Sequence, residues 1–212
     1  MRKILKVPYD TEGTFIRRIN KFLGEVKIGN RKELIHIHDP GRIEHLKKGV
    51  VVFLKREENP KRKTKYDLIA VGNEKIFTNS KYHNSIAEVL LKERFRKIER
   101  EVKIGNSRID FLVDGLPLEV KGCTLMKNKV ALFPDAPTQR GLRHLNEIIK
   151  HRGYLMFLIL RNANCFAPNP LDKKFYITFK KTLGKFKTIN VVLKYDGVWI
   201  KFVKEISLCQ SF

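Results

Sequence analysis

The stretch SRIDFLVDGLPLEVKG, residues 107–122, constrains the fold most, because two runs of alternating apolar and polar residues meet at Asp114-Gly115. Asp-Gly is a preferred two-residue turn between antiparallel strands. Successive side chains of a strand point to opposite faces. The stretch therefore predicts a β-hairpin in which Asp110 lies opposite Glu119. One face of the hairpin is entirely apolar: Ile109, Phe111, Val113, Leu116, Leu118 and Val120.

The opposing carboxylates need compensation, because like charges directly across a strand pair repel each other. One interpretation is structural: Arg108 and Lys121 neutralise Asp110 and Glu119 on a solvated face. The other is functional: a divalent cation, Mg²⁺ or Mn²⁺, lies between the two carboxylates, since hard cations prefer oxygen ligands. Lys121 would then point into the same site, where it could orient or deprotonate a water or neutralise a phosphate.

The charge of the chain favours a polyanionic partner. Lysine and arginine number 44 against 22 aspartate and glutamate, a formal net charge of +22. A ribosomal site, a membrane surface or the lysine-rich surface of a thermophilic protein are alternatives. The basic residues are spread through folded-looking segments, without a basic tail or a basic amphipathic helix, which favours a globular nucleic-acid binder. The chain has no apolar run of membrane-spanning length and no signal-peptide pattern, so we expect no membrane partner.

The cysteines indicate the redox environment. Cys123, Cys165 and Cys209 lie far apart and form no C-x-x-C pattern. An odd, scattered set predicts neither a disulfide framework nor a zinc site, and it favours a reducing cytoplasm.

Residues 1–79 are predicted to form a small β-barrel. Short runs rich in β-branched and aromatic residues are separated by turn residues. They span residues 12–20, 24–28, 33–38, 50–55, 65–71 and 75–77. Short strands packed this closely in sequence favour a closed barrel of the OB type. Residues 42–48 are predicted to form a short helix between strands.

Residues 80–212 are predicted to form a second, mixed α/β domain with helices packed on a central sheet. The helices are expected at 80–98 and at 136–153, the latter opened by Asp135 and Pro137 and closed by Gly153. Residues 154–160 are apolar throughout, as in a strand buried on both faces. The state of residues 175–186 is ambiguous. Further strands are expected at 101–104, 108–113, 116–122 and, as a pair turning at Asp196-Gly197, within 190–203.

Several segments carry a family resemblance. Asp110 followed by Glu119-Val120-Lys121, between two predicted helices, resembles the PD-(D/E)xK nuclease core. Over nearly the whole chain, and in consistent order, the sequence resembles the sugar fermentation stimulation protein A (SfsA) family. The matching segments are DPGRIEHLKKG (39–49), RKTKYDLIAV (62–71), SRIDF (107–111), LEVKG (118–122) and FPDAPTQRGLRHL (133–145).

The resemblance implies an N-terminal OB-like β-barrel followed by a restriction-endonuclease-like α/β domain with a central mixed sheet. It also implies DNA binding without marked sequence preference. Asp110 and Glu119 would be the metal-site acids, Lys121 the active-site lysine and Glu88 the helical acid of the nuclease class. For Glu88 an ordinary exposed helix glutamate is the alternative. Asp39 stands where the family usually has asparagine.

Nucleic-acid contacts are expected from a basic loop of the barrel and from the start of the helix after the metal strand, although a solvated loop and a polar outer helix face are the alternatives. The expected contacts are Arg42, Lys61, Arg62, Lys63, Lys65, Gln139 and Arg140. His144 falls on a polar stripe of that helix, opposite its leucines. His36 and His38 are expected at the surface and not at a metal. Phe15, Phe22, Phe53 and Tyr66 are expected in the core and not as base-stacking platforms.

These features predict a cytoplasmic, two-domain DNA-binding protein with a Mg²⁺-dependent phosphodiesterase site. One alternative is a DNA-binding regulator of sugar-utilisation genes in which the nuclease-like site no longer cuts. A weaker alternative is an RNA-processing factor, because basic barrels also bind RNA. The sequence does not define an oligomeric state and leaves a homodimer open.

Overall fold

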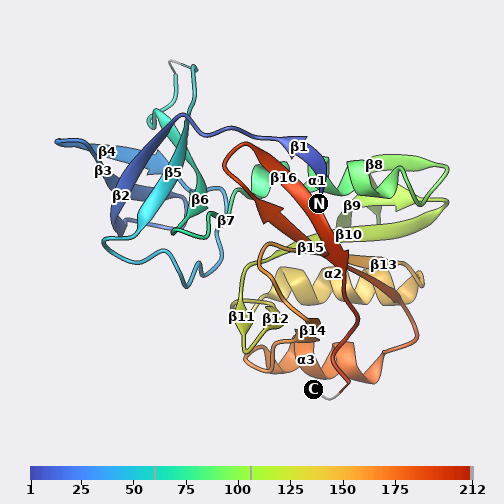
Figure 1. Ribbon diagram of the computed structural model, residues 1–212. Coiled ribbons are helices and arrows are strands. Elements are labelled where there is room, and N and C mark those ends of the chain that lie inside the picture. Colours follow the sequence, from blue (N-terminus) through green and yellow to red (C-terminus); the bar gives the residue numbers. More distant parts are fainter. Residues whose placement is uncertain (60, 106, 211–212) are drawn as a thin grey trace.

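A computed structural model describes residues 1–59, 61–105 and 107–210. Figure 1 shows a barrel on one side and a larger sheet with helices on the other. The barrel strands follow the order β4-β3-β2-β5-β6-β7, and a parallel pairing of β4 with β6 closes the barrel. This confirms the predicted OB-like domain. The strands are β2 (Thr11–Arg18), β3 (Leu23–Ile28), β4 (Arg31–His36), β5 (Val51–Arg56), β6 (Tyr66–Val71) and β7 (Ile76–Phe77).

The segment between β4 and β5 is not the helix predicted for residues 42–48. Ile43 is buried in the barrel core, and the Leu46 N–H donates to the Ile43 carbonyl in a simple turn. So short a segment gains few helical hydrogen bonds for the cost of nucleating a helix. Anchoring Ile43 in the barrel therefore decides the local conformation.

The larger sheet has seven strands in the order β1-β16-β15-β13-β10-β9-β8. Strands β10, β13 and β15 run parallel to one another, and the outer pairings are antiparallel. The sheet is thus mixed, as predicted. Its strands are β1 (Arg2–Lys6), β8 (Ile98–Ile104), β9 (Ser107–Val113), β10 (Leu116–Cys123), β13 (Tyr154–Ile159), β15 (Lys187–Tyr195) and β16 (Trp199–Glu205).

Helices cover both faces of this sheet. A 3₁₀ turn, η1 (Ser80–Tyr82), and α1 (His83–Leu91) pack on one face, while α2 (Gln139–Lys150) and α3 (Lys173–Lys181) pack on the other (Figure 1). The apolar strand β13 is therefore buried on both sides. The ambiguous segment at 175–186 begins as α3. No helix in the described part of the chain is long and apolar enough to cross a membrane.

The helix ends differ from the predicted ones. Thr138, and not Asp135, caps α2: its Oγ1 accepts the Gly141 N–H at 2.9 Å. Asp172 Oδ2 in turn accepts the Thr138 N–H at 2.9 Å, which ties the start of α2 to the start of α3. Helix α1 ends at Leu91 instead of residue 98, because the chain must turn there to enter β8.

A small sheet of β11 (Met126–Lys127), β12 (Val130–Phe133) and β14 (Cys165–Pro168) was not predicted. Its β14 carries a disulfide between Cys165 and Cys209, which corrects the expectation of reduced cysteines. The two residues are 44 positions apart, and the C-terminal segment brings them together by running beside β14. Cys123 is free and buried.

The first strand crosses the predicted domain boundary. Residues 1–79 were assigned to the barrel, yet β1 pairs with β16 at the edge of the larger sheet. The core is shared as well, because Phe53 and Phe77 of the barrel belong to the same buried cluster as Ile86 of α1. The barrel and the larger sheet therefore pack as one continuous body.

Candidate active site

The hairpin of β9 and β10 has the predicted register as far as its pairing extends. The pairs are Leu116–Val113, Pro117–Leu112 and Leu118–Phe111. Beyond them, Asp110 and Glu119 do not form a regular pair. Instead, the Val120 N–H donates to Asp110 Oδ2 at 2.8 Å, and the Asp110 N–H lies 3.4 Å from Glu119 Oε2. The two carboxylates thus meet where the strand ladder ends.

Asp110 is held by α1 as well as by β10. The Asn84 amide donates to Asp110 Oδ1 at 3.1 Å. Burial and the neighbouring charge of Glu119 raise the pKa of Asp110, and the Val120 N–H offsets part of that rise. Both oxygens therefore have defined positions, yet neither forms an ion pair with a lysine or arginine among the described residues.

Glu119 is nearly inaccessible, with 3% of its side chain exposed. Its Oε1 contacts Lys121 Nζ at 2.5 Å and also His144 Nδ1. Burial alone would raise the pKa of Glu119, but the hydrogen bond from His144 and the charge of Lys121 outweigh it and lower the pKa. Glu119 is thus kept ionised in a buried position, which is the charge state that a metal ligand needs.

Lys121 connects these carboxylates to a cleft of about 280 Å³. The cleft lies between the loop after β4 and the larger domain. Neither Asp110 nor Glu119 lines it. The charged or ionisable residues of its lining are Asp39, His83, Lys121, Cys123, Asp135 and Arg140. Lys121 and Arg140 are therefore the two cations of the cleft lining.

Gly122 makes room for His83 beside Lys121. A Cβ atom on Gly122 would lie 2.1 Å from His83 Cε1, so only glycine fits here without a shift. His83 Nε2 is buried and has no hydrogen-bond partner among the described residues. Burial, with a smaller contribution from the charge of Lys121, lowers the pKa of His83 to about 4. The imidazole is therefore neutral at pH 7.

A second carboxylate pair, Asp39 and Asp135, forms part of the cleft wall. A Cβ on Gly41 would lie within 3.0 Å of both side chains, which places the two carboxylates next to each other. Burial and the charge of Asp39 raise the pKa of Asp135 to about 6. Arg18 approaches this wall and donates to the backbone carbonyls of Asp39 and Gly41 at 2.7 Å each.

Glu88 is not brought to the carboxylates, which corrects its assignment as a metal ligand. Its side chain pairs with Lys92 at 3.1 Å and Arg100 at 3.4 Å. Asn84, one helical turn earlier, is the α1 residue that reaches Asp110. In the described part of the chain no cluster of three or more histidine, cysteine, aspartate or glutamate side chains is arranged for a metal.

The basic residues in the loop between β5 and β6 are only partly exposed. Lys61, Lys63 and Lys65 are exposed. Arg62 instead pairs with the buried Asp67 and, at 3.3 Å, with Glu57. Its charge is therefore partly neutralised within the barrel.

The remaining predicted contacts lie near the cleft or outside it. Arg140 lines the cleft, and Gln139 is exposed at the start of α2. Arg42 is exposed, and its backbone N–H donates to Asp135. Of the three, Arg140 is the one that shares a wall with Lys121.

His144 was the main omission from the predicted site. It was placed on a polar stripe of α2 and given no role at the site, but it is only 2% exposed and contacts Glu119. Its position one turn after Arg140, in the segment FPDAPTQRGLRHL, was the available signal. Asn84, His83 and Asp135 were likewise missed, because each reaches the site only through the packing of distant elements.

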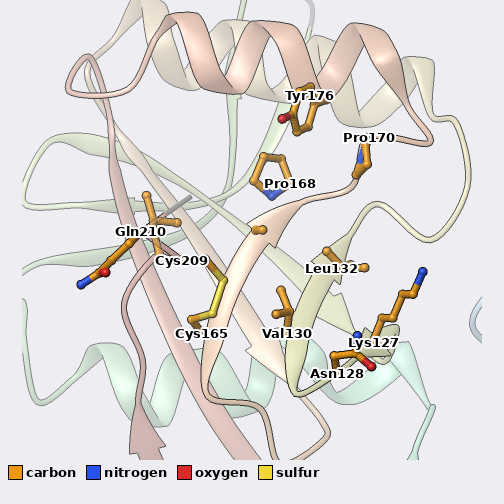
Figure 2. Close-up of a pocket in the computed structure, with 12 residues that line it drawn as sticks. Lys127, Asn128, Val130, Leu132, Cys165, Pro168, Pro170, Tyr176, Cys209 and Gln210 are labelled. Atoms are coloured by element: carbon orange, nitrogen blue, oxygen red, sulfur yellow. A yellow bond between two sulfur atoms is a disulfide. The ribbon is translucent and has the colours of Figure 1, made fainter. Parts of the chain in front are cut away.

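A larger cavity lies elsewhere, beside the disulfide. It measures about 730 Å³, and none of the described residues that line it is an acid or a histidine. Figure 2 shows the Cys165–Cys209 bond at its wall, with Tyr176 of α3 at the other end. The smaller cleft is the better candidate site, because Lys121 joins it to the carboxylate of Glu119.

Comparison with known families decides the relationship of this chain. Residues 16–79 match the SfsA N-terminal OB domain, and residues 73–195 match the sugar fermentation stimulation protein RE domain. The chain belongs to the SfsA family. The family assignment made from the quoted segments is therefore confirmed.

Relatives within the SfsA family match over almost their full length. The sugar fermentation stimulation protein homolog of Thermotoga neapolitana is 43% identical, over 98% of this chain and 99% of that protein. The homolog of Saccharolobus solfataricus is 39% identical, over 94% and 86%. The structure of Pyrococcus furiosus SfsA in complex with Ca²⁺ has a TM-score of 0.89 at 25% identity, covering 99% of this chain and 100% of that one.

Proposed function

We propose that this SfsA-family protein binds DNA and hydrolyses its phosphodiester bonds with Mg²⁺ or Mn²⁺. The carrying observation is that Asp110, Glu119 and Lys121 meet where the β9–β10 ladder ends, with Lys121 opening onto a cleft. The remaining support comes from the donor set, the basic surface and the relatives.

The donor set fits a hard divalent cation. Mg²⁺ is commonly held by one or two carboxylates together with waters and substrate phosphate. Among the described residues, Asp110 accepts one amide N–H and one backbone N–H, and Glu119 Oε2 has the 3.4 Å contact with the Asp110 N–H. Asp110 and Glu119 would hold the ion, which would polarise a phosphate oxygen and acidify a bound water. The Ca²⁺ in the Pyrococcus furiosus structure is another cation that prefers oxygen ligands.

The other residues position the two carboxylates and neutralise charge. His144 and Lys121 keep Glu119 ionised, while Asn84 orients Asp110. Fixed positive groups aimed at a developing negative charge stabilise a transition state. The Lys121 ammonium and the Arg140 guanidinium in the cleft would do this for the phosphate.

DNA is the proposed partner because of the charge of +22 and the exposed lysines 61, 63 and 65. A DNA substrate favours a cytoplasmic location. The Cys165–Cys209 disulfide fits that location only if the source is a hyperthermophile, since disulfides are rare in the cytosol of other organisms.

The test is a nuclease assay on single-stranded, duplex and branched DNA with Mg²⁺ or Mn²⁺. Lys121→Ala should lower the cleavage rate about 10²- to 10³-fold, the usual effect of removing one charge-stabilising donor. Lys127→Ala, outside the cleft, is the matched control. Cleavage that resists EDTA and is unchanged in Lys121→Ala, or no cleavage of any substrate, would exclude the nuclease.

A non-catalytic DNA-binding regulator of sugar-utilisation genes is the second candidate. It is favoured by the engagement of Glu119 Oε1 with both Lys121 and His144, which leaves that oxygen no free position. It predicts DNA affinity that falls steeply with salt and is unaffected by Asp110→Asn. Competition between DNA and RNA of matched sequence tests the RNA alternative.

A further inference from the structure

Phe22 is an exposed aromatic residue at the turn between β2 and β3. It was expected in the core, yet it is 49% exposed. Its ring stacks on His36, with centroids 6.3 Å apart and planes inclined by 11°. His36 in turn meets His38 edge-on, with centroids 4.4 Å apart. The ring is therefore supported by a second ring while half of its surface faces solvent.

The turn that carries Phe22 is held in place by its own hydrogen bonds. The Phe22 N–H donates to Asn20 Oδ1 at 2.8 Å, and the Phe22 carbonyl accepts the Ile37 N–H at 2.9 Å. Arg18 donates to the carbonyls of Asn20 and Lys21 at 3.2 and 2.6 Å. A ring fixed before binding loses little conformational entropy when a ligand stacks on it.

Arg18 also joins this turn to the cleft. The same guanidinium donates to the Asp39 and Gly41 carbonyls, and Asp39 lines the cleft with Lys121. Phe22 thus lies one side chain away from the loop that forms the cleft wall. Lys21, the exposed neighbour of Phe22 in the chain, adds positive charge beside it, whereas the exposed Arg17 is paired with Glu25 at 2.9 Å.

We infer that Phe22 is a stacking platform for an unpaired base, and that the ligand of the cleft is single-stranded DNA. The inference rests on the proposed function, which places a phosphate near Lys121. Proteins that bind single strands combine a basic track with aromatic rings that stack on successive bases. A base inside a duplex has both faces covered by its neighbours and cannot stack on a protein ring without being extruded.

The test compares binding of single-stranded and duplex DNA of one sequence, in EDTA to prevent cleavage. Phe22→Ala should weaken single-strand binding about 5- to 150-fold and leave duplex binding unchanged. Phe22→Trp should retain single-strand affinity, because it keeps an aromatic face. Leu34→Ala is the matched control, an apolar residue that is 40% exposed on the same barrel. It should bind like the wild type.

Single strands that carry one abasic site, moved along the sequence, locate the stacked base. The wild type should lose affinity at one position, and Phe22→Ala should lose none there. Three results would each overturn the stacking role. Phe22→Ala could weaken single-strand and duplex binding equally, or it could leave single-strand binding unchanged. The third is that the wild type is a dimer and that Phe22→Ala dissociates it. If the wild type binds duplex DNA normally in those cases, the proposed function stands. If it binds neither DNA, the proposed function fails together with the inference.

Discussion

At the scale of single residues, the environment of Glu119 is the most unusual feature of the molecule. A carboxylate with 3% of its side chain exposed shares one oxygen with an ammonium and an imidazole. Removing one partner of such a group leaves a buried charge only partly compensated, which costs more than the contact itself is worth. Lys121 and His144 therefore both lower the pKa of Glu119 and stabilise the fold around its buried charge.

His144→Ala is expected to destabilise the fold by about 1.5–3 kcal/mol at pH 7, the usual cost of losing a hydrogen bond to a charged group. Glu119 would lose its strongest pKa-lowering partner, so its pKa would rise. A group with a lowered pKa stabilises the fold above its unfolded value and loses that contribution as the pH falls. Urea unfolding at pH 7 measures the loss.

The matched control for His144→Ala is His151→Ala. His151 belongs to the C-terminal end of the same helix, is 39% exposed in its side chain and contacts Glu147 only at 3.9 Å. It should change stability little, since exposed ion pairs contribute little. Equal effects of the two substitutions would contradict a special role for His144.

At the scale of elements, the C-terminal segment is held to β14 by both backbone and covalent bonds. The Phe166 N–H donates to the Ser207 carbonyl at 3.0 Å, and the Cys209 N–H donates to the Phe166 carbonyl at 2.9 Å. The Cys165–Cys209 bond lies beside these contacts. After β14, Asn169 donates to the Phe133 carbonyl at 2.7 Å, which connects this region to the loop that carries Asp135.

Cys209→Ser should lower the free energy of unfolding by about 4 kcal/mol, the chain-entropy value for a closed loop of this length. The closed loop spans 44 positions. Wild-type protein treated with a thiol reductant should show the same loss, and the variant should no longer respond to the reductant. Cys123→Ala, which removes the free thiol and keeps the disulfide, should remain as sensitive to reductant as the wild type. A reductant effect that persists in Cys209→Ser would contradict this account.

At the scale of the whole molecule, the barrel and the larger sheet share one buried cluster, and β1 joins them covalently and through the sheet. A shared core favours a single cooperative unfolding transition. The histidines of this body set its response to acid. His45 and His83 both have pKa values lowered to about 4, His45 chiefly by burial.

Stability should therefore fall by roughly 2 kcal/mol between pH 7 and pH 5. An unfolded histidine binds a proton near its ordinary pKa of 6.5, so between 6.5 and 4 the unfolded chain holds more protons. Asp135 acts in the opposite direction: its pKa of about 6, against an ordinary 3.8, favours the folded state as the pH falls. The two histidines outweigh it.

Urea unfolding at both pH values checks this balance. Asp135→Asn removes the opposing contribution and should make the fall in stability steeper. A stability that is constant or rises from pH 7 to pH 5 in the wild type would show that His45 and His83 are not kept neutral.

The sequence by itself determined the features that depend on neighbouring residues. Alternation and the Asp114-Gly115 turn predicted the register of β9 and β10, and the short runs before residue 80 predicted the barrel strands. These features follow from the period of the strand backbone and the conformation that a turn requires, which are local properties.

Only the tertiary structure decided which side chains surround Glu119. His144 is 25 positions away, and nothing in the helix period distinguishes its place on a polar stripe from a contact with a buried acid. The choice of Asn84 over Glu88, the Cys165–Cys209 bond and the place of β1 have the same origin. Each depends on how separate elements pack, and packing is set by long-range contacts that a local pattern does not contain.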